Sequence, residues 1–184
     1  YDLIVIGAGS GGVRAARIAA SYGAKVAIIE NIRVGGTCVL RGCVPKKLLV
    51  YGSHVSQEIK SAQGYGWQFD GVSHDWSKLI ASKNKELDRL HNIYMGLLSE
   101  VDIIKGYGDI LSPQEVIVGK RVLKTNNIII AVGGKPYMPD ITGIEHCIDS
   151  DKALDLEKLP NKIVIYGGGY IALEFAGIFN SLES

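Results

Sequence analysis

The sequence has little of what marks several large classes of protein. Its 184 residues hold three cysteines and no visible secretory signal, which argues against a disulfide framework. Lys and Arg number 20 against 19 Asp and Glu, and this net charge of +1 predicts attraction to neither nucleic acid nor membranes. No long basic run or low-complexity tract is present. Since 47% of the residues are hydrophobic, we expect a folded protein with a substantial core.

The first positive feature is a glycine-rich turn near the start of the chain. The apolar run at residues 3–6 leads into Gly7, Gly9 and Gly12, which have the spacing G-x-G-x-x-G. The first glycine permits a tight turn, the second lets the backbone approach a pyrophosphate, and the third lets helix and strand pack closely. Glycine-rich turns also occur without ligands, so the spacing alone is a weak signal.

The residues after this turn strengthen the interpretation. A helical pattern over residues 13–21 is followed by a second apolar run at 25–29 that ends on Glu30, eighteen residues past Gly12. A carboxylate at that point would accept hydrogen bonds from ribose hydroxyls, while the helix amino terminus attracts phosphate. We therefore predict a dinucleotide site rather than a plain structural turn.

The chain contains a second copy of this pattern. With a shift of 160 positions, residues 163–172 lie over residues 3–12, and Gly167, Gly169 and Ala172 take the fingerprint positions. The third position tolerates alanine. Two such turns predict two dinucleotides, one in each of two domains.

The stretch that contains the second copy has an interpretation that involves no nucleotide. Residues 163–179 are almost wholly apolar, as in a buried core segment or a membrane span. The short length of this stretch and Glu174 near its middle argue against a span.

The length of the chain limits the domain organisation. The second fingerprint begins only about twenty residues before the end, which leaves no room for its return strand and crossover helix. We expect the front of a larger protein, with an incomplete first domain at residues 1–160 and the start of a second at 161–184. The chain opens on Tyr1 without an initiator methionine, so trimmed targeting residues remain open; we expect a cytoplasmic protein, with an organelle as the alternative.

Between the fingerprints, the pattern predicts helices and then short strands. The helices are expected at residues 43–62 and 75–99. The inner face of the second is expected to contain Trp76, Leu79, Ile80, Leu87, Leu90, Tyr94, Leu97 and Leu98. The strands are expected at 101–104, 116–118, 122–124 and 128–132. The parallel sheet of this α/β fold is expected to contain 3–6, 25–30 and 128–132.

Two cysteines lie five residues apart, at Cys38 and Cys43. In a reducing compartment such a pair is more often a metal site or a redox couple than a structural disulfide. A zinc site needs two further ligands, and the histidines lack the usual spacing. They are His54, His74, His91 and His146. Redox chemistry is the better interpretation.

Cys43 is expected to open a helix. There it would gain thiolate character from the helix dipole and from Lys46. Cys147 stands alone, and we interpret it as a bystander.

Together these motifs resemble those of the flavoprotein disulfide reductases, the class I pyridine nucleotide-disulfide oxidoreductases, and most of all their glutathione-reducing branch. The resemblance is carried by residues 35–47, Gly-Gly-Thr-Cys through Cys-Val-Pro-Lys-Lys, by the first fingerprint, and by residues 167–174. It implies a Rossmann-like FAD-binding domain with a parallel sheet and a β-meander, followed by the beginning of a Rossmann-like NADPH-binding domain. Electrons would pass from NADPH through flavin and the cysteine pair to oxidised glutathione.

The resemblance also implies roles for individual residues. Cys43 would be the thiolate beside the flavin, and Cys38 would attack the substrate disulfide. Lys46 and Glu174 would form an ion pair next to the flavin ring, and if that pair were buried, removing one partner would cost about 3 to 5 kcal/mol. Tyr170 would cover the flavin until nicotinamide displaces it; the alternative is an ordinary core tyrosine.

The remaining implied contacts fall into three groups. The FAD contacts are Gly7, Gly9, Ser10, Gly12, Glu30, Gly36, Thr37, Lys46, Gly108, Ala131 and Gly133. The contacts with the second nucleotide are Gly167, Gly169, Tyr170 and Ala172, and those with glutathione are Ser10, Arg17 and Tyr94. Val132 stands where many relatives have threonine. Arg14 adds a positive charge beside Arg17, which suits an anionic tripeptide better than a polyamine conjugate, although two arginines on a helix are usually just solvated surface.

Several alternatives stay open. Dihydrolipoamide and mercuric reductases share the cysteine spacing but usually have serine-lysine where this chain has Lys46-Lys47, and trypanothione reductase is disfavoured by the two arginines. A non-catalytic FAD-binding module is the alternative from another class. Relatives act as homodimers in which a histidine and a glutamate of the partner subunit donate the proton, and this chain lacks that region.

We therefore expect the isolated 184 residues to bind FAD weakly at best and not to turn over. The purified segment, mixed with FAD, NADPH and oxidised glutathione, should oxidise NADPH no faster than a protein-free control. Turnover above that background would contradict the expectation.

Overall fold

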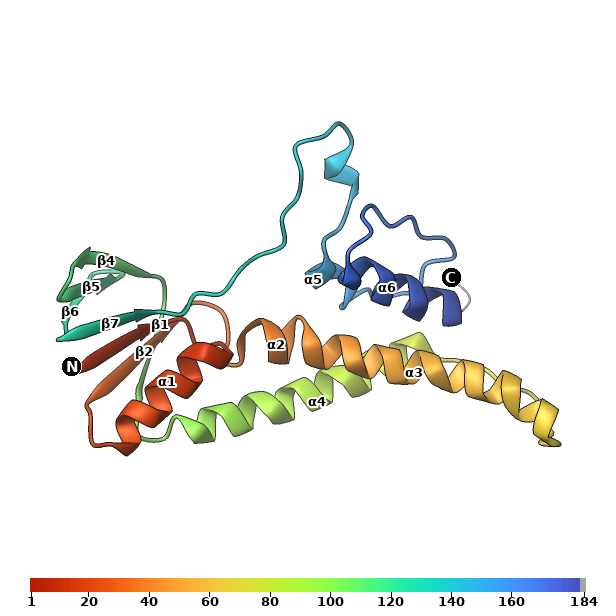
Figure 1. The fold of residues 1–184 in the computed structure, drawn as a ribbon, viewed down its shortest axis with the longest axis horizontal. Helices are drawn as coiled ribbons and strands as arrows, with labels where there is room; N and C mark the ends of the chain where they lie inside the picture. The colour runs from red at the N-terminus through yellow and green to blue at the C-terminus, as the bar shows by residue number, and fades with distance from the viewer. Residues whose placement is uncertain (183–184) are drawn as a thin grey trace. The chain divides into compact units, whose positions relative to one another are not determined.

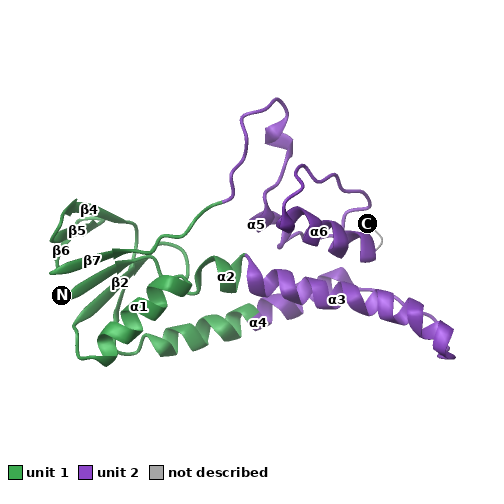
Figure 2. Ribbon diagram, viewed as in Figure 1, with its two compact units in different colours: residues 1–41, 87–135 green, residues 42–86, 136–184 purple. Residues whose placement is uncertain are grey.

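The computed structural model describes residues 1–182 and divides into two compact units, coloured separately in Figure 2. Unit 1 contains residues 1–41 and 87–135. Unit 2 contains residues 42–86 and the chain from Pro136 onward. These units reflect packing in this chain, and the division into cofactor domains at residue 160 stays a prediction.

Unit 1 is built on a four-stranded parallel sheet (Figure 1). Its strands run in the order β3 (Asp102–Lys105), β2 (Val26–Glu30), β1 (Leu3–Ile6) and β7 (Asn127–Ile130). The register aligns Leu3 with both Val26 and Asn127. The predicted parallel sheet is confirmed, but the sequence did not show that β3 belongs to it.

A second, antiparallel sheet follows in the chain as a meander. It consists of β4 (Gly108–Ser112), β5 (Glu115–Val118) and β6 (Arg121–Lys124). The expected β-meander is confirmed. Its first strand was missed because β4 has only two apolar side chains, Ile110 and Leu111, which are adjacent and form neither an alternating pattern nor a longer apolar run.

The two central strands of the parallel sheet, β1 and β2, are buried on both faces, and their side chains alternate between those faces. One face packs against helix α1 (Ser10–Ser21) through Leu3, Val5, Val26, Ile28, Val13 and Ala16. The other packs against the meander through Ile4, Ile6, Ala27, Ile29, Val116, Val118 and Leu123. Because α1 covers one face and the meander covers the other, every side chain of β1 and nearly every side chain of β2 is buried, which explains their continuous apolar runs. This packing holds the carboxyl ends of the two strands in place.

Unit 2 is mainly helical. Its helices are α3 (Cys43–Ala62), α5 (Ser150–Ala153) and α6 (Tyr170–Ser181), with single 3₁₀ turns at Gln63–Tyr65 and Ile144–His146. The expected helix at 43–62 is confirmed. Its core contains Leu49, Trp76, Leu154, Phe175, Ile178 and Phe179. The rings of Phe175 and Phe179 stack with centroids 6.0 Å apart.

Helix α4 (Trp76–Leu97) begins in unit 2 and ends in unit 1. In unit 2 the fully buried Lys83 donates from Nζ to the carbonyl of Leu154 at 2.7 Å and pairs with Asp155. Trp76 Nε1 donates to the carbonyl of Leu156 at 2.7 Å. These polar contacts tie the first half of α4 to the chain after α5.

Two expectations differ from the structure. The helix expected at 75–99 is α4, which ends at Leu97. Of the last two residues expected on its inner face, Leu97 is exposed, whereas Leu98 is buried as expected but lies beyond the helix end. Residues 163–166 of the second fingerprint form no strand, and Val164 and Tyr166 are exposed. A strand is defined by hydrogen bonds to a neighbour, and within residues 1–182 this segment has no neighbouring strand.

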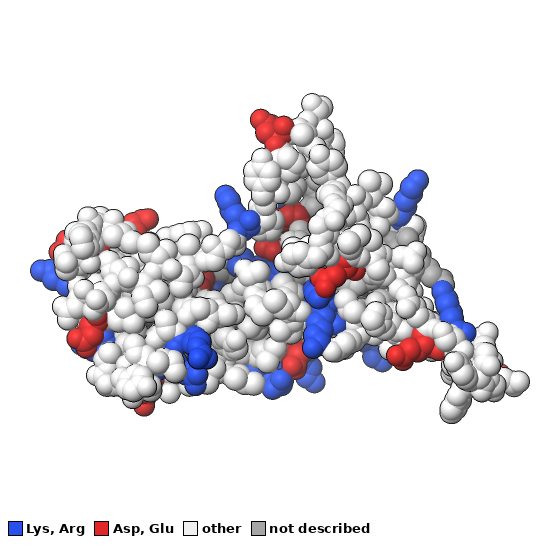
Figure 3. All heavy atoms as spheres, viewed as in Figure 1, with Lys and Arg blue, Asp and Glu red and all other residues white. Residues whose placement is uncertain are grey.

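Charge is spread over the molecule. On the face drawn in Figure 3, basic and acidic side chains are interspersed, with no large area of a single sign. Among the described residues, no helix is both long and apolar enough to cross a bilayer.

The glycines of α1 allow a test of this packing. A Cβ on Gly12 would overlap the carbonyl oxygen of Gly7, whereas a Cβ on Gly11 meets nothing within 4 Å. We expect Gly12→Ala to lower the free energy of unfolding by about 1 to 3 kcal/mol. Gly11→Ala, the matched control, should be neutral or stabilising by up to about 1 kcal/mol. Chemical denaturation of both variants measures this, and equal effects would contradict the close approach.

Candidate functional site

The glycine-rich turn after β1 has the geometry of a nucleotide cradle. Gly7 has φ +103°, and a Cβ there would overlap the carbonyl group of Ala131 at the end of β7. Gly12 presses against Gly7, and the amide of Val13 donates to the carbonyl of Gly9 at 2.9 Å as α1 begins. Backbone atoms therefore exclude a side chain at positions 7 and 12.

The amino terminus of α1 suits a phosphate. Gly9 is the N-cap, without a capping side chain, and the first turn of the helix contains no acidic residue. The first amide groups of a helix carry partial positive charge and need acceptors. The residues present thus fit the pyrophosphate of a dinucleotide.

Glu30, at the carboxyl end of β2, bridges two loops. Its Oε2 accepts from the amide of Ala8 at 2.9 Å, and its Oε1 accepts from the amide of Ile32 at 2.8 Å. The carboxylate is thereby fixed beside the glycine-rich turn, with lone pairs left for ribose hydroxyls.

Most other predicted FAD contacts lie at the same carboxyl edge of the sheet. Gly36, with φ +64°, lies so close to the turn that a Cβ would overlap Cα of Gly9. Gly108 begins β4, and a Cβ there would crowd Ile29. The remaining residues placed in unit 1 are the exposed Ser10 and Thr37, with Ala131 and Gly133 after β7, whereas Lys46 is in unit 2.

The second fingerprint repeats the backbone of the first. Gly167 has φ +127°, close to the +103° of Gly7. Gly169 caps α6 with φ −74° and ψ 171°, against −81° and −168° for Gly9 at α1. Tyr170, the first residue of α6, is 75% exposed, so it is not a core tyrosine in this structure. Ala172 takes the third position, and the four residues stay predicted nucleotide contacts.

The two cysteines lie in consecutive helices. Cys38 lies in α2 (Gly36–Leu40), and Cys43 is the first residue of α3, with Gly42 as its N-cap. The predicted helix start at Cys43 is therefore confirmed. Cys43 is exposed and Cys38 is partly buried. Exposure alone would favour Cys43 as the attacking thiol, so the roles assigned to the two sulfurs rest on the resemblance.

Lys46 on α3 and Glu174 on α6 form an ion pair within unit 2. Lys46 Nζ donates to Glu174 Oε1 at 2.6 Å, although 128 residues separate them. Their side chains are 27% and 35% exposed. The pair is half-buried, so the cost of 3 to 5 kcal/mol expected for a buried pair is too high.

The predicted glutathione contacts divide between exposed and half-buried positions. Arg14 and Arg17 are both exposed on α1, one helical turn apart, and Ser10 is exposed at its start. Tyr94 on α4 packs partly buried against the core of unit 1. An exposed basic face on α1 is present, as the sequence predicted.

Two residues of α4 were missed. Asp88 pairs with Arg33, and His91 contacts the carbonyl of Val34, just ahead of the cysteine-bearing helix. The sequence offered His91 only as one scattered histidine. The available signal was the spacing of three residues between Asp88, His91 and Tyr94, which places them on successive turns.

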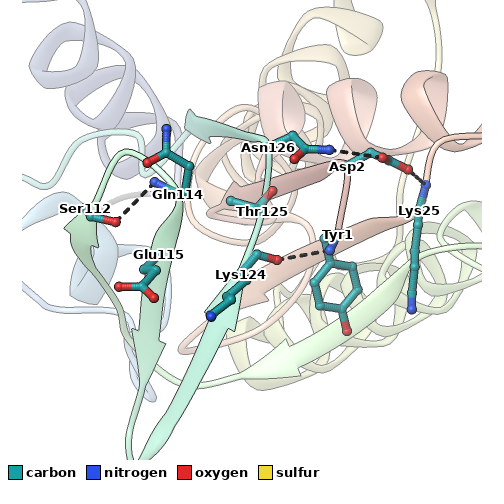
Figure 4. A pocket seen from close by; sticks show the side chains of 9 residues that line it. All are labelled: Tyr1, Asp2, Lys25, Ser112, Gln114, Glu115, Lys124, Thr125 and Asn126. Atoms are coloured by element: carbon teal, nitrogen blue, oxygen red, sulfur yellow. Dashed lines mark hydrogen bonds between the residues drawn. The ribbon is translucent and has the colours of Figure 1, made fainter.

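A cavity of about 610 Å³ lies elsewhere on unit 1 (Figure 4). Tyr1, Lys25 and Asn126, which line it, precede β1, β2 and β7, so the cavity lies at the amino ends of the strands. The hydroxyl of Tyr1 donates to Asp102 at 2.8 Å, and this bond raises the pKa of Tyr1. Dinucleotides bind at the carboxyl ends of such sheets, so we do not assign this cavity to the cofactor.

The fold and these residues define the class of dinucleotide-binding proteins, with the cysteine-bearing helix α2 packed at the glycine-rich turn and a second cysteine five residues further along the chain. The family described as pyridine nucleotide-disulphide oxidoreductase matches residues 1–184. The chain belongs to this family.

Relatives of known name agree with this membership. The chain is 52% identical over its whole length to glutathione reductase, chloroplastic/mitochondrial, of Pisum sativum, covering 36% of that protein. It is 53% identical over 99% of its length to glutathione reductase of Burkholderia cepacia, covering 41% of it. The HOCl-induced flavoprotein disulfide reductase RclA from Escherichia coli matches the whole chain with a TM-score of 0.87 and 30% identity, covering 40% of that structure. The chain thus spans about two fifths of these relatives.

The half-buried ion pair leads to a prediction. A double-mutant cycle of Lys46→Met and Glu174→Gln should give a coupling energy of about 1 kcal/mol, between the values of exposed and buried pairs. The coupling should shrink in high salt because part of the pair is solvated. Thermal or chemical unfolding of the four proteins measures it.

Lys47→Met is the control, since Lys47 is exposed and its ammonium lies 5.4 Å from the ring of Tyr51 rather than at Glu174. Coupling between Lys47 and Glu174 as large as that of the pair would contradict the assignment.

Proposed function

We propose that the protein carrying this chain is an FAD-dependent disulfide reductase that passes electrons from NADPH to oxidised glutathione. The observation that carries the proposal is the packing of Gly36 against Gly9. This contact places the first residue of the helix that bears Cys38 against the turn that fits a dinucleotide pyrophosphate. The sulfur of Cys38 would therefore lie close to the bound nucleotide.

The first turn fits a dinucleotide pyrophosphate, and the resemblance to the flavoprotein disulfide reductases makes FAD the dinucleotide that we propose for it. The residues that would hold it are Gly7, Gly9, Gly12, Glu30 and Gly36, with the contacts given above. When bound, FAD supplies transfer of two electrons from a reduced nicotinamide to the cysteine disulfide. The second turn, with Gly167, Gly169 and Ala172, would hold NADPH.

The cysteines would carry out the exchange with substrate. The Cys38 thiolate attacks one sulfur of glutathione disulfide, which forms a mixed disulfide and releases one glutathione thiolate. The Cys43 thiolate then attacks the sulfur of Cys38, which releases the second glutathione and leaves a Cys38–Cys43 disulfide. Two electrons and a proton from NADPH, with one proton from solvent, balance the two thiols produced.

Three further residues would support this chemistry. The ammonium of Lys46, held by Glu174, would lie next to the flavin ring. Tyr170 would cover the ring in the absence of nicotinamide, and its exposure at the start of α6 leaves it able to turn.

The choice of glutathione is supported by relatives and by charge. Two relatives at 52% and 53% identity are named glutathione reductase. The exposed Arg14 and Arg17 offer guanidinium groups to an anionic tripeptide. Ser10 and Tyr94 would complete the glutathione contacts.

The assembly and the compartment are also proposals. A homodimer would supply the proton-donating histidine and glutamate from a partner subunit. We propose a cytoplasmic protein, because the cysteine usage suits a reducing compartment; the pea relative is named chloroplastic/mitochondrial.

A dihydrolipoamide reductase is the second candidate. A dihydrolipoyl dehydrogenase of Acholeplasma laidlawii is 40% identical over the whole chain. Activity with dihydrolipoamide and NAD exceeding that with glutathione disulfide and NADPH would favour it.

Separate serine variants of the cysteines, made in the full-length protein, test the proposal. Each should keep its flavin and lose disulfide reduction on the order of 10³-fold, because each removes one of the two sulfurs of the exchange. In Cys43→Ser the mixed disulfide with glutathione should accumulate on Cys38, since the resolving thiol is gone. Mass spectrometry of the trapped protein identifies the modified residue.

Cys147→Ser is the control and should leave activity unchanged. A glutathione adduct on Cys43 in Cys38→Ser would reverse the two roles. Unchanged reduction in both variants, with flavin retained, would instead support a non-catalytic FAD-binding module.

A further inference from the structure

The four residues that lead into the cysteine-bearing helix are held from one side by α4. Arg33 pairs with Asp88, with 2.7 Å between the guanidinium nitrogen and Oδ1. The carbonyl oxygen of Val34 lies 2.9 Å from Nδ1 of His91. Since a carbonyl only accepts, the ring nitrogen Nδ1 carries the hydrogen. One turn of α4 therefore binds two consecutive residues of the loop.

The same loop is held from the other side by the glycine-rich turn. The amide of Gly35 donates to the carbonyl of Ala8 at 2.9 Å. The backbone of Gly36 lies against Gly9, and the side chain of Val34 is buried in the core of unit 1. Because Gly35 and Gly36 both have positive φ, +128° and +64°, this loop would be free to move if its contacts were lost.

The two contacts with α4 differ in strength. The side chains of Arg33 and Asp88 are 36% and 65% exposed, so water and salt weaken their attraction. His91 is half-buried, and its bond satisfies the backbone carbonyl of Val34, a residue that is itself buried. His91 should therefore matter more than Asp88.

We propose that His91, assisted by Asp88, is a positioning residue for Cys38. His91 fixes the loop from Arg33 to Gly36, which leads directly into α2, the helix that contains Cys38. Tyr94, one turn further along α4, is a proposed glutathione contact. The same helix would therefore position both the sulfur of Cys38 and the substrate that it attacks. This inference rests on the proposed disulfide reductase function and names a residue that the resemblance does not assign.

The test compares His91→Ala with His91→Asn in the full-length flavoprotein. Asparagine places an amide donor near the position of Nδ1, whereas alanine removes the donor. We expect His91→Ala to speed hydrogen exchange at the amides of residues 33–37 and to change the alkylation rate of reduced Cys38, each on the order of tenfold. Turnover of glutathione disulfide should fall tenfold or more with flavin content unchanged, because small displacements of reacting groups are costly. His91→Asn should restore all three to within about threefold.

Two more variants complete the design. Asn92→Ala, at an exposed position on the same helix, is the control and should change nothing. Exchanging the charges, with Arg33→Asp and Asp88→Arg together, should recover what either single change loses, which a general loss of folding would not do.

The outcomes separate this inference from the proposed function. If His91→Ala leaves exchange, alkylation and turnover as they were, or if His91→Asn is as impaired as alanine, the positioning role is wrong. If the unsubstituted protein contains flavin but reduces no disulfide, the proposed function fails, while a tenfold rise in hydrogen exchange at residues 33–37 would still support the clamp on the loop.

Discussion

The backbone contacts among glycines at the carboxyl edge of the parallel sheet are the constraint on which the site depends. Gly12 presses on Gly7, Gly7 on Ala131, and Gly36 on Gly9. No side chain fits at these contacts, so three segments distant in sequence approach to backbone distance. The central strands beneath, β1 and β2, are buried on both faces and keep those segments in place. The turn proposed to bind phosphate and a cysteine-bearing helix thus become parts of one edge of the sheet.

Much of this edge could be predicted from sequence because its signals are local. The spacing of glycines, the apolar runs of β1 and β2 and the acid at position 30 each act within one βαβ step. The helix start at Cys43 followed from Pro45 in its first turn. By contrast, β4 was missed because its two apolar residues form neither an alternating pattern nor a longer run, and the place of β3 beside β2 depends on pairing between segments more than seventy residues apart.

The contacts from α4 could not be predicted for a similar reason. Asp88 and His91 find partners 55 and 57 residues away, and helical periodicity says only which residues share a face. The pairing of Lys46 with Glu174 spans 128 residues, and it was expected only through the resemblance. The segment at 163–166 shows the opposite effect, since an apolar run alone does not make a strand when no neighbour offers hydrogen bonds within residues 1–182. Local chemistry is therefore readable from the chain, whereas long-range polar partners need coordinates.

The hydrogen bonds from two backbone amides to Glu30 have a consequence for nucleotide selectivity, because the first glycine-rich turn would have to discriminate between the two proposed cofactors. A carboxylate anchored through both oxygens is unable to swing aside, so an incoming adenosine with a phosphate on its ribose would meet a stationary like charge. The first turn would then reject the phosphorylated coenzyme that the second is proposed to accept. Such discrimination would need no further residue, since repulsion at Glu30 alone would disfavour the phosphorylated coenzyme.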